Sequence, residues 1–173
     1  MSEIQQTERA SKQLTSAVEW CKQFRHEFVM PEHLLLALTE DNNFTWALNI
    51  FSSTDELINR LKDQLNKTER VPVDVEYQPE TSVQLSKVLE IACQQVFYSS
   101  AQAVDTPHLV MGLLRLEDSW ACYLLKDLLA DNESEFMSQL INYCDFDINT
   151  LGSSDNMDDY DDDYEDDDYD DVI

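Results

Sequence analysis

Glycine and proline are scarce in this 173-residue chain, which holds two and four of them. Both residues interrupt helices, so their scarcity favours uninterrupted helical segments over a turn-rich β fold. Hydrophobic residues make up 43% of the sequence, which is enough for a helical globular core. The length allows one ordinary domain with a further segment.

Basic residues are also few. The chain has 11 Lys and Arg against 36 Asp and Glu, and its formal net charge is −25. Twelve of the acids lie in residues 155–171, which contain no Lys or Arg, so the remainder has 24 acidic against 11 basic residues, a net charge of −13. Binding to a phosphate backbone needs a basic surface, so we expect no nucleic-acid partner.

The sequence lacks long apolar runs and paired cysteines as well. No run approaches the roughly 18 residues of a membrane-spanning helix, and no basic-then-apolar segment opens the chain. We therefore expect a soluble cytoplasmic protein with no membrane partner. The four cysteines have no C-x-x-C spacing, so reduced buried thiols are favoured over a zinc site.

Helical periodicity is what the sequence has in quantity. Apolar residues in 6–25 recur at i, i+3, i+4 and i+7, the spacing of an amphipathic helix. Residues 31–38, P-E-H-L-L-L-A-L, are apolar almost throughout and predict about two buried helical turns that begin at a proline. Residues 28–30 form a short connector into them. Two further helices are expected over residues 44–51 and 53–66.

The same pattern returns in the second half of the chain. Residues 106–113, T-P-H-L-V-M-G-L, repeat residues 31–38, which places His108 over His33 at an offset of 75. Thr106 is predicted to cap this helix. We therefore predict an all-α fold of two tandem four-helix repeats with pseudo-two-fold symmetry, packed on each other. The predicted segments are the first repeat at 1–67, an ordered-to-flexible linker at 68–81, the second repeat at 82–149 and a tail at 150–173.

The predicted tail differs in composition from the two repeats. Runs of Asp broken by single Tyr residues make up most of it, with little aliphatic content. Such a segment cannot bury enough apolar surface to offset the entropy of ordering. The sequence therefore predicts that residues 150–173 form a disordered acidic tail.

One run of residues points to a family. Arg25-His26-Glu27-Phe28 is followed, after three residues, by E-H-L-L-L-A-L from residue 32. This run resembles the N-terminal domain of the Clp AAA+ unfoldases, most closely the ClpA type, and the resemblance covers about residues 5–145. It implies a recognition module that docks a ClpS-type adaptor and captures unfolded or degron-bearing proteins. These would pass to a Clp ATPase ring and its protease.

The same resemblance implies which residues bind the adaptor. Glu27 and Glu32 match family positions that contact it, and we expect both carboxylates to be exposed. Ser82 and Lys87 match positions on the same face, where the ClpA type has Thr and Arg. Unfolded segments would occupy an apolar groove between the repeats. The aromatic residues that could be exposed there are Phe44, Trp46, Trp120 and Tyr123.

Catalysis is not favoured by the sequence. The only glycines are Gly112 and Gly152, and neither precedes a Gly-Lys pair, so the chain has no phosphate-binding loop of the G-x-x-x-x-G-K-[ST] type. His26 and His33 have no third metal ligand at a fixed spacing. We therefore expect neither a cofactor nor an enzyme active site.

Two hypotheses follow. The first is the adaptor- and substrate-recognition domain of an ATP-dependent Clp unfoldase, with its ATPase in a separate part of a longer protein. The second is a stand-alone acidic regulator, either an accessory subunit of a Clp complex or a chaperone that binds basic proteins with its acidic tail.

Overall fold

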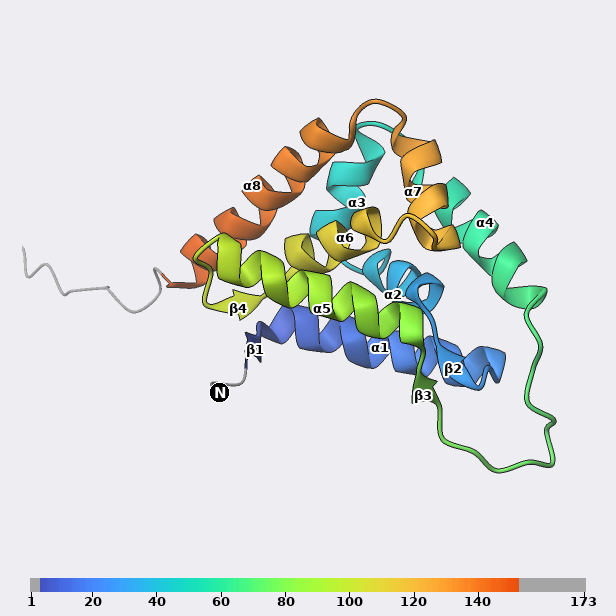
Figure 1. The fold of residues 1–173 in the computed structure, drawn as a ribbon. Helices are drawn as coiled ribbons and strands as arrows, with labels where there is room; N and C mark the ends of the chain where they lie inside the picture. The colour runs from blue at the N-terminus through green and yellow to red at the C-terminus, as the bar shows by residue number, and fades with distance from the viewer. Residues whose placement is uncertain (1–3, 153–173) are drawn as a thin grey trace, which may run out of the picture.

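The computed structural model describes residues 4–152, with side chains as far as Asp145. Within this range it contains eight α-helices (Figure 1). The first four are α1 (Glu8–Phe24), α2 (Pro31–Leu38), α3 (Asn42–Asn49) and α4 (Thr54–Asn66). The second four are α5 (Val83–Tyr98), α6 (Thr106–Arg115), α7 (Trp120–Leu129) and α8 (Glu133–Gly152). The predicted all-α fold of two four-helix repeats is confirmed.

Helix starts follow from local capping. The Thr7 side chain accepts a hydrogen bond from the backbone of Ala10 at the start of α1, and Ser82, its equivalent in the second repeat, does the same for α5. At the start of α6 the prediction was wrong by one residue, because Asp105 is the N-cap and Thr106 is already helical. The Asp105 carboxylate can accept two hydrogen bonds at once, and it takes them from the Thr106 amide and from Arg9.

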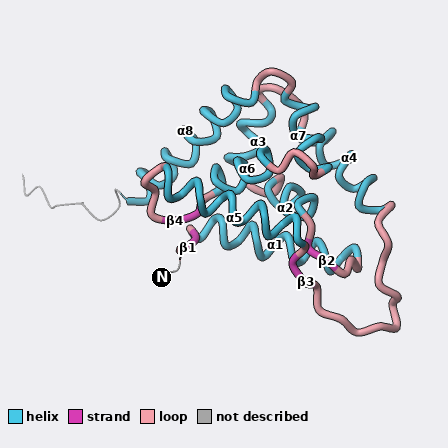
Figure 2. Tube along the Cα trace, in the orientation of Figure 1, coloured by secondary structure: helices cyan, strands magenta, loops and turns pink. Residues whose placement is uncertain are grey.

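Two pairs of short parallel strands join the repeats, at opposite ends of α1 and α5 (Figure 2). Strand β1 (Gln5–Gln6) pairs with β4 (Ala103–Val104), and β2 (Phe28–Val29) pairs with β3 (Glu80–Thr81). The repeat offset carries the residue numbers of β1 and β2 onto those of β3 and β4. Each repeat therefore pairs with the other through equivalent segments, and residues 28–30 are more than the simple connector that the sequence predicted.

The connection between the repeats, residues 68–81, is attached to the end of α1 by one side chain. The Arg25 guanidinium donates to the carbonyls of Val71, Pro72 and Val75 at 3.0, 2.6 and 2.8 Å. It also lies over the ring of Tyr77, with its central carbon 5.3 Å from the ring centroid. The backbone of Arg25 is in the left-handed region (φ 55°), where it closes α1 in place of a glycine.

The core is built around α2, all eight residues of which are buried. The equivalent helix of the second repeat, α6, approaches α5 so closely that a side chain at Gly112 could not be accommodated. A Cβ atom there would lie 2.5 Å from the backbone oxygen of Val88. One of the two glycines is thus required by helix packing rather than by a turn.

The repeats also meet through α3 and α8. The rings of Phe44 and Phe136 make an edge-to-face contact with their centroids 5.8 Å apart, and neither ring is exposed. Helix α8 continues to Gly152, past the boundary predicted at residue 149. The rest of the predicted disordered tail, residues 153–173, lies outside the described residues. None of the described helices is long and apolar enough to cross a membrane.

Candidate functional site

Two of the predicted adaptor-binding residues, Glu27 and Ser82, lie on one hydrogen-bonded ladder. The Glu80 amide donates to the carbonyl of Glu27, and the Ser82 amide donates to the carbonyl of Val29, both at 3.0 Å. Ser82 then caps α5 with its hydroxyl oxygen. The hydroxyl proton stays available to a partner. The β2–β3 pair therefore brings together segments that are distant in the sequence.

Exposed apolar side chains lie beside these polar groups. Phe28 is 41% exposed and Val83 is 73% exposed. Lys87, four residues after Val83 on α5, is exposed on the same side of the helix. We call these five residues the β2–α5 face: Glu27, Phe28, Ser82, Val83 and Lys87.

Glu32 does not belong to this face, and the expectation that its carboxylate is exposed is wrong. The residue is only 7% exposed. One oxygen of its carboxylate accepts a hydrogen bond from the backbone of Ala121 in the first turn of α7, where Ser119 already caps the helix through Cys122, whereas Oε2 is buried without a hydrogen-bond partner among the described residues. Burial raises the pKa of Glu32, although the hydrogen bonds from its own backbone and that of Ala121 act to lower it. Glu32 thus joins the two repeats by stabilising the start of α7.

Removal of the Glu32 side chain should therefore destabilise the fold. Glu32→Ala leaves a buried helix-terminal amide without its acceptor, and we expect the free energy of unfolding to fall by about 1–3 kcal/mol. Urea unfolding followed by circular dichroism measures this change. Glu27→Ala is the matched control, because its exposed carboxylate should alter stability by less than about 0.5 kcal/mol. Equal midpoints for the two variants would contradict the buried role of Glu32.

A pair of buried histidines lies beneath the β2 segment. The Met30 amide donates to Nδ1 of His33 at 2.8 Å, so the proton of a neutral His33 is on Nε2. That atom lies 2.8 Å from Nδ1 of His26, which must be the acceptor. The proton of His26 is then on Nε2, which faces the Leu65 carbonyl without a full hydrogen bond. Both rings are buried and held neutral by this arrangement.

The structure contains a second candidate site, a groove between α6 and α8 that the sequence did not specify. Its volume is about 490 Å³, in the range of ligand-binding sites. We call it the α6–α8 groove. Its apolar side chains belong to Ala101, Ala103, Pro107, Met111, Met137 and Ile141. Its polar side chains belong to Thr7, Gln95, Ser99, Gln102, Asp105, His108 and Asp145.

The groove and the β2–α5 face occupy equivalent places in the two repeats. The repeat offset relates Thr7 to Ser82 and Glu27 to Gln102. Helix α4 ends at Asn66, whereas α8 continues past the equivalent residue, Ile141, and forms one wall of the groove. The repeat offset thus relates this site to the β2–α5 face, but it does not reveal the wall that α8 forms.

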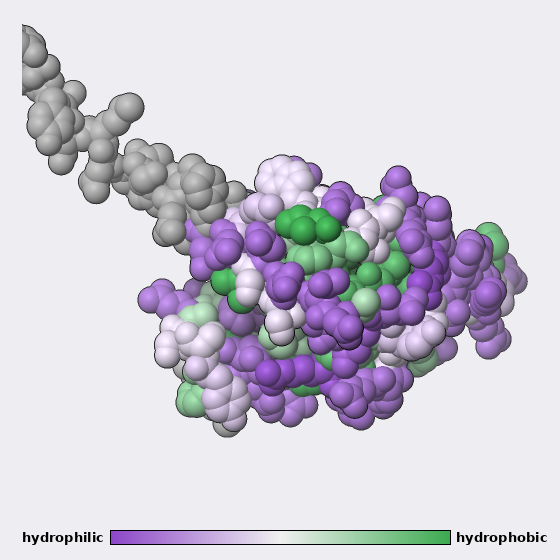
Figure 3. All heavy atoms as spheres, turned by 90° about the horizontal axis from the view of Figure 1, so that it is seen from above, coloured by the Kyte–Doolittle hydropathy of each residue, from purple (hydrophilic) through white to green (hydrophobic). Residues whose placement is uncertain are grey.

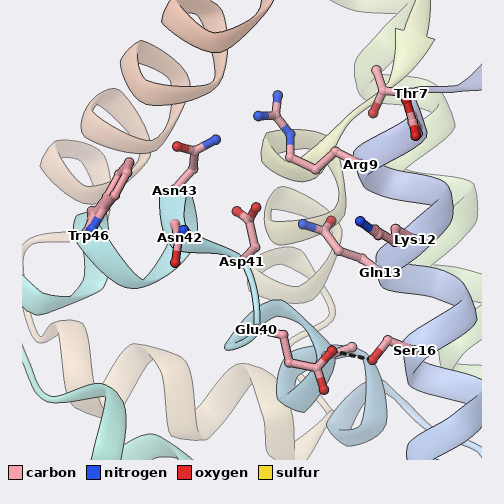
Figure 4. Close-up of a pocket in the computed structure, with 12 residues that line it drawn as sticks. Thr7, Arg9, Lys12, Gln13, Ser16, Glu40, Asp41, Asn42, Asn43 and Trp46 are labelled. Atoms are coloured by element: carbon pink, nitrogen blue, oxygen red, sulfur yellow. Dashed lines mark hydrogen bonds between the residues drawn. The ribbon is translucent and has the colours of Figure 1, made fainter.

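A third hollow, between α1 and the start of α3, is polar and has a volume of about 610 Å³ (Figure 4). Several of its polar side chains form hydrogen bonds that stabilise the fold. Glu40 accepts hydrogen bonds from Ser16 and from the indole of Trp20, and Asp41 caps α3. The Gln13 oxygen accepts a hydrogen bond from Thr106 at 3.0 Å. We assign no binding role to this hollow.

Exposed apolar side chains also occur outside the β2–α5 face and the α6–α8 groove. Viewed from above, the protein has a mostly hydrophilic surface with hydrophobic groups gathered near its centre (Figure 3). Of the predicted exposed aromatics, Trp46 and Tyr123 are 54% and 59% exposed, and Trp120 is half-buried. The fourth candidate, Phe44, is fully buried. None of these four residues lines the α6–α8 groove.

Residues 5–128 match the family model of the Clp repeat N-terminal domain. The chain belongs to this family. Clp N-terminal domains are protein-interaction domains, and the ATPase of Clp proteins lies in other domains. The described residues contain no cluster of three or more potential metal ligands among His, Cys, Asp and Glu.

Solved structures share this fold. The N-terminal domain of Hsp104 from Candida albicans is 19% identical with a TM-score of 0.65, over 81% of this chain and 91% of that one. The N-terminal domain of ClpD from Arabidopsis thaliana is 21% identical with a TM-score of 0.63, over 82% of this chain and 95% of that one. A ClpV N-domain in complex with a VipB peptide is 16% identical with a TM-score of 0.56, over 76% and 87% of the two chains. A comparison with curated proteins gives no match.

Proposed function

We propose that this Clp N-domain is the adaptor- and substrate-recognition part of a cytoplasmic, ATP-dependent Clp unfoldase. It docks a ClpS-type adaptor on the β2–α5 face and passes proteins on for degradation. The observation that carries this proposal is the exposed apolar pair, Phe28 and Val83, bordered by the charged Glu27 and Lys87.

The β2–α5 face has the features of a protein-docking surface. An apolar centre with a polar rim is the usual anatomy of such interfaces. The backbone hydrogen bonds of the β2–β3 ladder fix the positions of Phe28 and Ser82, so little conformational entropy is lost on binding. Glu27 and Lys87 supply opposite charges that can orient a partner.

Glu32 contributes to this function indirectly. It follows the Met30 N-cap and Pro31 at the start of α2, directly after β2, and its carboxylate is committed to α7. We assign Glu32 a positioning role, in which it holds α2 and α7 together behind the face. Its loss should weaken adaptor binding only as far as it loosens the fold.

The α6–α8 groove is the place we propose for unfolded or degron-bearing segments. Its apolar groups include two methionines, Met111 and Met137, whose flexible side chains adapt to different sequences. The solved complex of a ClpV N-domain with a VipB peptide shows that a related fold can hold a peptide.

Glu27→Ala should weaken binding of a ClpS-type adaptor. The exposed carboxylate would accept a charge-assisted hydrogen bond, which contributes roughly 1.5–3 kcal/mol, so affinity should fall about ten- to a hundredfold. Isothermal titration calorimetry of the purified chain with the adaptor measures the loss.

Glu69→Ala is the control for that measurement. Glu69 is an exposed acid outside the β2–α5 face, so it tests attraction by the negative charge of the whole domain. An equal loss at both positions would indicate diffuse attraction, and unchanged affinity for Glu27→Ala would refute the docking face.

A further inference from the structure

The α6–α8 groove has an acidic rim. Asp145, from α8, is exposed, and among the described residues no Lys or Arg lies within salt-bridge distance of it. None of the described residues that line the groove is Lys or Arg. His108 lines it too, but burial lowers the pKa of this histidine despite the nearby Asp105, so it is neutral near pH 7.

The basic side chains nearest to the groove, those of Arg9 and Lys12, do not pair with Asp145. Arg9 binds the Asp105 carboxylate with Nε and Nη2, at 3.1 and 2.8 Å, and Nη2 also donates to the carbonyl of Cys144 on α8 at 3.5 Å. Burial alone would raise the pKa of Asp105, but the hydrogen bonds from Arg9, Thr106 and Thr7 lower it. This carboxylate is therefore ionised, and its negative charge is balanced by the Arg9 guanidinium. Lys12 points into the polar hollow beside α1 (Figure 4). Among the described residues, Asp145 is therefore left without a salt-bridge partner at the rim.

The next hollow along α6 differs in its charge. It shares Met111 and Met137 with the groove but contains Arg115 and Lys126. Lys126 lies 3.8 Å from Glu117 and 4.0 Å from Glu133, so its charge is balanced. An unbalanced negative rim is thus a property of the α6–α8 groove and not of this whole side of α6.

We propose that the α6–α8 groove selects peptide segments in which a Lys or Arg lies next to apolar residues. The apolar side chains occupy the space between Met111, Met137 and Ile141, and the basic side chain pairs with Asp145. The net charge of −13 outside the acidic stretch also draws basic segments toward the domain. This inference rests on the proposed client site, but not on the adaptor face.

The groove can be occupied while an adaptor is bound. Ser82 and Lys87 lie at the start of α5, whereas Gln95 and Ser99 line the groove at its other end. A helix of 16 residues is about 24 Å long, so the two surfaces are separated by most of its length. A peptide in the groove should therefore not compete with the adaptor.

The test uses three fluorescein-labelled synthetic peptides and the full chain, with binding measured by fluorescence anisotropy. The first peptide contains Leu, Lys and Ser, the second has each Lys replaced by Glu, and the third has each Leu replaced by Ser. We expect only the first to bind well. Ile141→Ser and Asp145→Lys should each lower its affinity about fivefold, through lost apolar contact and through charge reversal.

Matched controls separate the groove from the rest of the surface. Ile50→Ser removes another half-exposed isoleucine, and Asp131→Lys reverses another exposed acid, so both should change affinity by less than about twofold. Attraction by the acidic residues 155–171 is the same in every variant. Salt should reduce the effect of Asp145→Lys and leave that of Ile141→Ser largely unchanged.

Two results would overturn the proposal. One is equal binding of the Lys and Glu peptides, and the other is equal losses for Asp145→Lys and Asp131→Lys. Displacement of the first peptide by saturating ClpS-type adaptor would refute a separate groove site. If the adaptor binds and none of the peptides does, only the groove inference fails, whereas failure of both would also remove the proposed function.

Discussion

Acidification from pH 7 to pH 5 should lower the free energy of unfolding by about 2 kcal/mol through His33 alone. Burial and the neighbouring His26 lower the pKa of His33 to about 3 in the folded protein, against 6.5 in an unfolded chain. Each pH unit below 6.5 then costs about 1.4 kcal/mol, and the loss continues down to about pH 3.

The direction of this effect follows from proton binding. Between pH 6.5 and pH 3 the unfolded chain protonates His33 and the folded protein does not, so added protons favour unfolding. Burial also lowers the pKa of His26, and the positive charge of Arg70 acts in the same sense. Cys21 contacts the backbone of His26 through its thiol but carries no charge, because burial raises its pKa to about 11.

Glu32 acts in the opposite direction. Burial raises its pKa in the folded protein, so the folded state binds this proton more tightly and acidification relieves the cost of the buried charge. The two histidines should outweigh this single carboxylate between pH 7 and pH 5, where both would otherwise become charged. Urea unfolding at each pH gives the net dependence.

His33→Gln tests the origin of this pH dependence, and His108→Gln is its control. His108 occupies the equivalent place in the second repeat, where its Nδ1 accepts the Asp105 amide at 2.9 Å, but it has no second imidazole against it. The stability of His33→Gln should depend less on pH between 7 and 5 than that of His108→Gln. A wild-type protein equally stable at pH 5 and pH 7 would contradict the neutral histidine pair.

Phe136→Ala should destabilise the domain by about 3–5 kcal/mol. The ring is fully buried between the repeats, and its removal combines lost transfer energy with a cavity that rigid helices cannot fill. At about 2–4 °C per kcal/mol for a domain of this size, the thermal midpoint should fall by roughly 10 °C. Differential scanning calorimetry measures this shift.

Phe97→Ala provides the control for the loss of a phenyl ring. Phe97 is 82% exposed, so its removal should change stability by less than about 0.5 kcal/mol. A double-mutant cycle with Phe44→Ala should give a coupling of about 0.5–1.5 kcal/mol for the edge-to-face contact. Additive losses at Phe44 and Phe136 would show that the two rings do not stabilise each other directly.

The helical fold and its duplication could be predicted from the residues alone. Helix periodicity depends only on local spacing, so apolar residues at i, i+3, i+4 and i+7 predicted α1, and the apolar run that begins at Pro31 predicted α2. The offset between His33 and His108 showed the two repeats. In the structure the ring of each of these histidines accepts a hydrogen bond from the backbone amide of its own helix cap. Family membership could be recognised from the run that begins at Arg25.

Which groups are exposed could not be predicted in this way, because exposure depends on what packs against a residue from elsewhere in the chain. Glu27 and Glu32 are both acids near one helix start, yet Glu27 is open to water while Glu32 is covered by α7. Phe44 and Trp46 are neighbours on α3, and only Phe44 is fully buried, against Phe136 of α8. One wall of the α6–α8 groove is likewise formed by α8, which continues past the point where its counterpart α4 ends. This wall becomes visible only when the helices are placed in space.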